Sequence, residues 1–143
     1  MTELSFLAES GGPLIHPWRG SADDLLDAAP MHAWLGWLRG SRMRTRQGLM
    51  DEWAAAAQFP PHFGGTWDAL RDALCDLPEG GTFLVLEADQ LLQDAPPHEA
   101  ETLWRVLRDV RGDLAPRPFR MVLQADSEDF DTLVAGLRAM GVD

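Results

Sequence analysis

Residues 82–87 read Thr-Phe-Leu-Val-Leu-Glu, and this short stretch decides the fold predicted for the chain. It has the length of a strand, it is apolar almost throughout, and turn residues at Pro78, Gly80 and Gly81 precede it. Strands that expose one face alternate apolar and polar residues, whereas strands covered on both faces are continuously apolar. The stretch therefore predicts a buried strand of a parallel sheet.

Similar patterns extend outward on both sides of this strand. Further buried strands are predicted at residues 32–38 and 117–124, and a short edge strand at 13–18, where Pro17 is tolerable. Helices are predicted at about residues 21–29, 47–58, 67–77, 97–111 and 126–140. Strands and helices that alternate in this way describe a small α/β layer fold.

Two of these helices are predicted to begin with a capping box. In a capping box the N-cap residue and the residue three positions later bind each other's backbone N–H groups through their side chains. The first pair is Ser21 with Asp24, and the second is Asp126 with Asp129.

The composition limits the classes of partner. The 143 residues fit one domain (residues 1–143), and an apolar content of 45% suffices for a buried core. The 23 acidic residues exceed the 12 basic ones, all of them arginines, which gives a formal net charge of −11. Binding to nucleic acid or to an anionic membrane relies on cationic side chains, so neither is expected, and a cationic partner is favoured.

A soluble, cytoplasmic protein is expected from the cysteine content and the N-terminal sequence. Cys75 is the single cysteine, so no intramolecular disulfide can form and a secreted disulfide scaffold is excluded. Its thiol is expected to be inert, because neither a histidine nor a cationic pocket lies near it in the sequence. The N-terminus lacks a basic leader, and no segment approaches the roughly 18 apolar residues of a membrane span.

The helix predicted at residues 67–77 carries aspartates at intervals of four: Asp68, Asp72 and Asp76. At about 100° per residue they occupy one side of the helix, opposite an apolar side that begins with Trp67 and Leu70. Like charges at this spacing destabilise a helix by roughly 0.2–0.5 kcal/mol per pair, and Asp76 lies near the negative end of the helix dipole. A solvated face is the ordinary explanation of such a run, but a face selected for stability would use glutamate and interleave lysine.

The residues on either side of this helix carry further features in a fixed order. In chain order these features are Gly40, Leu49, Trp53, Phe59-Pro60, Phe63-Gly64, the helix Trp67–Asp72, the strand Leu84–Glu87, Val106–Asp109 and the strand at residues 117–124. Together they resemble the barstar family, whose members inhibit secreted ribonucleases. The resemblance covers roughly residues 32–124.

The resemblance implies a layered fold with a three-stranded parallel sheet flanked by helices. Residues 1–31 would then form an N-terminal extension that adds one edge strand, residues 32–124 the family core, and residues 125–143 a C-terminal helix.

The resemblance also implies an intracellular inhibitor of the antitoxin or immunity type. Its acidic helix and the preceding loop would enter the cationic active site of a basic secreted ribonuclease or toxin domain, in a 1:1 complex. Asp68 and Asp72 would take the places of substrate phosphates, Asp72 the deeper of the two, with Asp109 and Asp113 as peripheral acids. The candidate partner-binding residues are His62, Phe63, Gly64, Thr66, Asp68, Arg71, Asp72, Asp109 and Asp113.

The chain departs from the family pattern beside these acids. His62 and Phe63 stand where members often have tyrosines, and Arg71 stands where an aromatic side chain is common. A barstar-like binding module for another cationic protein is therefore an alternative to ribonuclease inhibition.

Other kinds of site have weaker support in the sequence. A hydrolase that used Asp68 and Asp72 as acid and base would require a pocket and perturbed pKa values. Residues 64–66 lack the lysine of a phosphate-binding loop, and residues 98–101 lack a second histidine at ligand spacing. The arginine-rich residues 39–46 are predicted to be a solvated turn. We therefore expect a protein without enzymatic activity, cofactor or metal.

Overall fold

The computed structural model describes residues 13–29 and 35–142. Helices and strands occur close to the predicted positions, although residues 32–34 of the second predicted strand lie outside the described residues. In chain order the elements, with η for a 3-10 helix, are β1 (Ile15–Arg19), α1 (Ala22–Ala28), β2 (Leu35–Arg39), η2 (Gly40–Arg42), α2 (Arg46–Ala57), α3 (Trp67–Cys75), β3 (Gly81–Leu86), η3 (Ala88–Gln90), α4 (Pro97–Leu114), β4 (Phe119–Ala125) and α5 (Ser127–Ala139).

The described strands form one parallel sheet of four strands, in the order β1-β4-β3-β2. The sheet is therefore larger than the three strands implied by the family resemblance. The fourth strand is β1, which lies at the edge where the N-terminal extension was expected to add a strand. β1 pairs with β4 from Ile15 opposite Met121 to Arg19 opposite Ala125. Its edge position accommodates Pro17, which has no backbone N–H to donate.

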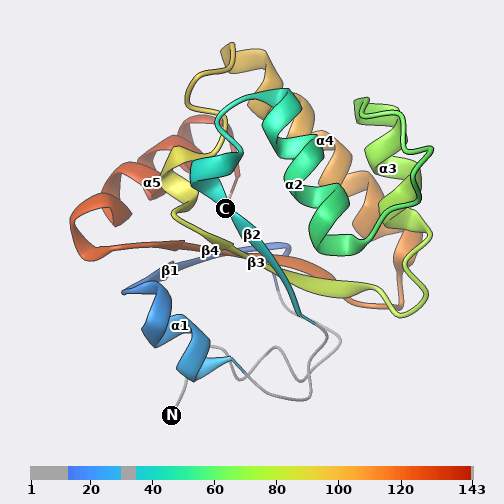
Figure 1. Ribbon diagram of the computed structural model, residues 1–143. Helices are drawn as coiled ribbons and strands as arrows, with labels where there is room; N and C mark the ends of the chain where they lie inside the picture. The colour runs from blue at the N-terminus through green and yellow to red at the C-terminus, as the bar shows by residue number, and fades with distance from the viewer. Residues whose placement is uncertain (1–12, 30–34, 143) are drawn as a thin grey trace.

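Helices cover both faces of the sheet, as the continuously apolar strands predict (Figure 1). α2, α4 and α5 lie on one face, with α3 beside α4, and α1 lies on the other face. Successive residues of β3 therefore contribute to two cores. Phe83 and Val85 belong to the larger core beneath α2 and α4, whereas Leu84 packs with Leu25 of α1.

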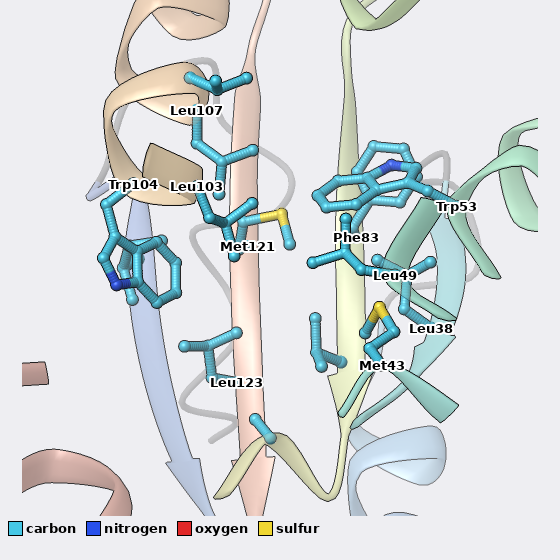
Figure 2. Packing of buried hydrophobic residues seen from close by; sticks show 14 of the residues in the cluster. Leu38, Met43, Leu49, Trp53, Phe83, Leu103, Trp104, Leu107, Met121 and Leu123 are labelled. Atoms are coloured by element: carbon cyan, nitrogen blue, oxygen red, sulfur yellow. The ribbon is translucent and has the colours of Figure 1, made fainter. Parts of the chain in front are cut away.

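The larger core fixes the helices that carry the candidate site. Figure 2 shows Trp53 of α2 against Phe83 of β3, and their ring centroids are 5.3 Å apart. Leu103 and Leu107 of α4 lie over the same face of the sheet, beside Met121 of β4. All five side chains are at most 2% exposed, so α2 and α4 are held firmly against the sheet.

Only one of the two predicted capping contacts occurs. The N–H of Asp24 donates to the Ser21 hydroxyl at 3.1 Å, as predicted for the first turn of α1. Asp126 is the N-cap residue of α5, but its side chain makes no capping hydrogen bond, so the second prediction is wrong. The N–H of Asp129 donates instead to the backbone carbonyl of Asp126 at 2.9 Å, and the Asp126 carboxylate lies 3.5 Å from the side-chain amide nitrogen of buried Gln124.

Candidate partner-binding surface

α3 begins at a well-defined N-cap. The Thr66 hydroxyl accepts a hydrogen bond from the N–H of Ala69 at 3.1 Å, which satisfies one of the free donors of the first turn. Gly65, directly before Thr66, has a φ of +68°, in the left-handed region that favours glycine. These two residues set the direction in which α3 leaves the preceding loop.

The loop before the helix presents three of the predicted residues, His62, Gly64 and Thr66, to solvent. Phe63 is half-buried and packs against Phe59, with ring centroids 4.9 Å apart. His62 and Gly64, on either side of Phe63, are exposed. The aromatic contact therefore anchors the loop, and its neighbours remain accessible.

α3 is amphipathic in the way the sequence predicts. Leu70 and Leu74 are fully buried, whereas Asp68, Asp72 and Asp76 are exposed. The helix ends at Cys75, two residues before the predicted end, and Asp76 is its C-cap residue. The three carboxylates thus follow one exposed side of α3 from its first turn to its C-terminus.

α3 packs against α4, and the side chain of Arg71 lies between the acids of the two helices. Its Nη2 donates to Asp113 Oδ2 at 2.8 Å. Its Nη1 is 3.8 Å from Asp72 Oδ1, and its Nε is 3.9 Å from Asp109 Oδ2. The structure therefore brings together four of the predicted residues, two from each helix.

These contacts leave the carboxylates accessible. The side chains of Asp72, Asp109 and Asp113 are 78%, 55% and 52% exposed, so Arg71 does not cover them. Asp68 is exposed and makes no ion pair among the described residues. We call Asp68, Asp72, Asp76, Asp109 and Asp113, with Arg71 among them, the acidic surface. Five carboxylates and one guanidinium give it a formal charge of −4.

Cys75 lies at the side of the acidic surface, also facing α4. Its thiol is half-buried and donates to Asp113 Oδ2 over 3.6 Å. Burial raises the pKa of the thiol, and the hydrogen bond to Asp113 raises it further, against the opposing effect of Arg71. This environment disfavours the thiolate and agrees with the expectation of an inert cysteine.

Glu99 is a further residue that matters to this surface, and sequence reasoning did not assign it a role there. Its carboxylate is largely buried, with 13% of the side chain exposed. Arg46 Nε of α2 lies 3.3 Å from Glu99 Oε2, and the indole N–H of Trp67 donates to Glu99 Oε1 at 3.4 Å. Glu99 therefore joins α2, α3 and α4 behind the acidic surface.

The arginine-rich residues 39–46 are partly tied to acids of the chain. Arg44 makes two hydrogen bonds to Asp94, at 2.8 and 3.1 Å, and Arg46 pairs with Glu99. Such internal pairing reduces the positive charge available to a nucleic acid.

The cavities found among the described residues have linings other than the acidic surface. One of them, with a volume of about 70 Å³, lies between η3, α4 and α5 and is lined by residues that include Leu92, Trp104 and Met140. Others lie beside Pro78, between Leu14 and Arg108, and around Pro116. No group of three potential metal ligands occurs within residues 13–29 and 35–142. In the same part of the chain, no helix combines the length and the apolar character needed to cross a bilayer.

The fold and the surface together define a class: a small α/β protein with a parallel sheet that displays exposed carboxylates on two adjacent helices. The family model described as Barstar (barnase inhibitor) matches residues 37–126, from within β2 to the residue after β4. The match covers more than half of the chain, and the chain belongs to the barstar family. The matched region includes the loop at residues 58–66 and the whole acidic surface. A comparison with curated proteins gives no significant match.

Proposed function

We propose that the protein is an intracellular inhibitor of the immunity type, which blocks the cationic active site of a microbial, barnase-type ribonuclease. The acidic surface on α3 and α4 would enter that site together with the loop that holds His62, Phe63, Gly64 and Thr66. The proposed complex contains one copy of each protein.

The observation that carries this proposal is the acidic surface, whose carboxylates remain more than half exposed beside Arg71. It lies in the region that matches the family described as the barnase inhibitor. An enzyme that cleaves RNA must hold phosphate groups with cationic side chains, and carboxylates at similar spacing are complementary to the same groups. The net charge of −11 would also accelerate encounter with a basic partner.

Asp68 and Asp72 are the proposed principal phosphate mimics, and Asp109 and Asp113 the peripheral acids. In the free protein the aspartates of α3 repel one another at intervals of four residues. Arginine and lysine side chains of the enzyme would relieve that repulsion. A few residues at the centre of an interface, where water is excluded, carry most of its binding free energy, and removing one partner of a charge pair there weakens binding strongly.

The alternative of a carboxylate-based hydrolase has less support, because the cavities described above are lined by other residues. A binding module for a different cationic protein is the second candidate. Arg71 favours it, because this side chain places a positive charge within the acidic surface.

The proposal is tested by titrating the full-length protein into barnase and into ribonucleases secreted by the source organism. RNA cleavage and calorimetric binding are followed together. We expect inhibition that is complete at one molar equivalent and that is lost in the double variant Asp68→Asn/Asp72→Asn. Asp27→Asn is the matched control, since Asp27 is an exposed aspartate of α1 on the opposite face of the sheet. A cationic protein that binds without any loss of ribonuclease activity would instead support the second candidate.

A further inference from the structure

We propose that Arg71 determines which ribonucleases the acidic surface accepts, by selecting a partner that presents a carboxylate within its otherwise cationic site. This inference rests on the proposed function and adds a requirement to it. The partner must supply cations for the aspartates and one anionic group for Arg71.

The position of Arg71 makes contact with such a partner unavoidable. Its guanidinium lies within 3.9 Å of carboxylates on both α3 and α4, so it occupies the middle of the acidic surface. The side chain is 37% exposed, which leaves part of it open to a partner that covers Asp72 and Asp109.

Arg71 uses only part of its hydrogen-bond donors in contacts with the described residues of the free protein. A guanidinium carries five N–H donors. Among the described residues one short hydrogen bond is formed, from Nη2 to Asp113 at 2.8 Å. The separations of 3.8 Å to Asp72 and 3.9 Å to Asp109 are too long for hydrogen bonds. Water can serve the remaining donors while the surface is exposed, but a partner that excludes water must replace those acceptors.

Arg71 also restricts where the partner's cations can lie. Asp72 Oδ1 is 3.8 Å from Arg71 Nη1, so an arginine or lysine that approached Asp72 from that side would meet a like charge. Asp68 and Asp76 are exposed and have no ion pair among the described residues. The partner's cations are therefore directed away from the Arg71 side of Asp72 and toward Asp68 and Asp76, and the space next to Arg71 suits an acceptor.

A carboxylate is the acceptor that this geometry favours. The planar guanidinium can donate two parallel hydrogen bonds to a carboxylate, and charge assistance makes these stronger than bonds to a neutral carbonyl. Such a group would be repelled by the rest of the acidic surface unless cations of the partner flank it. The combination of flanking cations and a central carboxylate is thus more selective than positive charge alone.

The test is a selection from a surface-displayed library of catalytically inactive barnase, with the residues around its active site randomised. The baits are the full-length protein, Arg71→Gln, Arg71→Lys, Arg138→Gln and Asp68→Asn/Asp72→Asn. Arg138 is an exposed arginine of α5, without an ion pair among the described residues, and is the matched control for loss of one positive charge. Arg71→Lys keeps the charge but loses the fork geometry, and thermal unfolding of every bait verifies that it is folded.

We expect clones selected by the wild-type protein and by Arg138→Gln to share an aspartate or glutamate at one position, which Arg71→Gln does not select. Changing that residue to its amide should weaken binding to the wild-type protein by about tenfold or more, and leave binding to Arg71→Gln unchanged. Arg71→Lys should show a weaker preference. Identical sequences selected by wild-type and Arg71→Gln baits would overturn the inference while leaving the proposed function intact. If the wild-type bait enriches no clone above the double aspartate variant, the proposed function fails and this inference fails with it.

Discussion

The indole Nε1 of Trp67, the first residue of α3, lies 3.4 Å from Oε1 of Glu99 in the first turn of α4. The same carboxylate is 3.3 Å from Nε of Arg46 at the start of α2, and 3.5 Å from Nε2 of His98. One largely buried carboxylate thus links the N-terminal ends of three helices. Because α3 and α4 carry the acidic surface, this link helps to set the spacing of its charges.

Glu99→Gln is expected to destabilise the protein by about 1–2 kcal/mol, because it keeps the shape of the side chain but removes the charge that binds Arg46 and Trp67. The measurement is urea unfolding followed by tryptophan fluorescence. Glu101→Gln is the matched control. Glu101 is exposed two residues along α4 and makes no side-chain hydrogen bond or ion pair among the described residues, so the loss of stability in this variant should stay below about 0.5 kcal/mol. Equal losses in the two variants would mean that the Glu99 contacts contribute nothing.

Cys75 is expected to react slowly with a disulfide reagent near neutral pH, because burial and the Asp113 hydrogen bond raise its pKa and lower its thiolate fraction. Asp113→Asn removes the carboxylate and so lowers the pKa of the thiol, which should raise the thiolate fraction and speed the reaction. Reaction rates measured from pH 6 to 9, together with Asp109→Asn as control, test this. Asp109 belongs to the same surface but does not contact the thiol, so equal acceleration by both variants would contradict the assignment.

The Arg44–Asp94 pair predicts a specific dependence of stability on pH. The hydrogen bonds from Arg44 hold the pKa of Asp94 below its ordinary value. A depressed pKa in the folded state contributes stability above the ordinary pKa of aspartate, and that contribution disappears as the pH falls through the folded-state pKa. Asp94→Asn should therefore lower the urea midpoint at pH 7, and the difference from wild type should shrink in acid. Asp27→Asn is the control. If the urea midpoints of Asp94→Asn and wild type differ by the same amount at pH 7 and at acid pH, this linkage is excluded.

Most of the secondary structure could be predicted because it depends on local patterns. The apolar run at residues 82–87 identified β3, and the 100° period identified the exposed and buried sides of α3. The same period places Arg71 and Cys75 at the boundary between the exposed and buried sides of α3. In the structure both side chains face α4, which is consistent with a position at that boundary.

The contacts between elements could not be predicted in this way. β1 pairs with β4, about a hundred residues later, and although an edge strand was predicted at residues 13–18, no local period reveals which strand it pairs with. The Arg71–Asp113 contact likewise depends on how α3 packs against α4. In both contacts tertiary packing decides an outcome that sequence spacing leaves open. The side-chain cap expected at Asp126 fails for a local reason, since the N–H of Asp129 donates to the backbone carbonyl of Asp126 instead.

The aspartates of α3 are expected to contribute unequally to binding. Asp72 stands between the other two and beside Arg71, whereas Asp76 is the C-cap residue at the end of the acidic surface. Hot spots lie near the centre of an interface, where water is excluded, and charges at the rim remain solvated. Asp72→Ala should therefore weaken binding to the inhibited ribonuclease by about 2 kcal/mol or more, and Asp76→Ala by less than about 0.5 kcal/mol.

Calorimetry at several salt concentrations measures both effects, with urea unfolding to correct for stability and Asp27→Ala as control. Because Asp76 acts mainly through long-range attraction, its small effect should vanish at high salt, while the Asp72 effect persists. Equal losses at Asp72 and Asp76 would place the centre of the interface elsewhere.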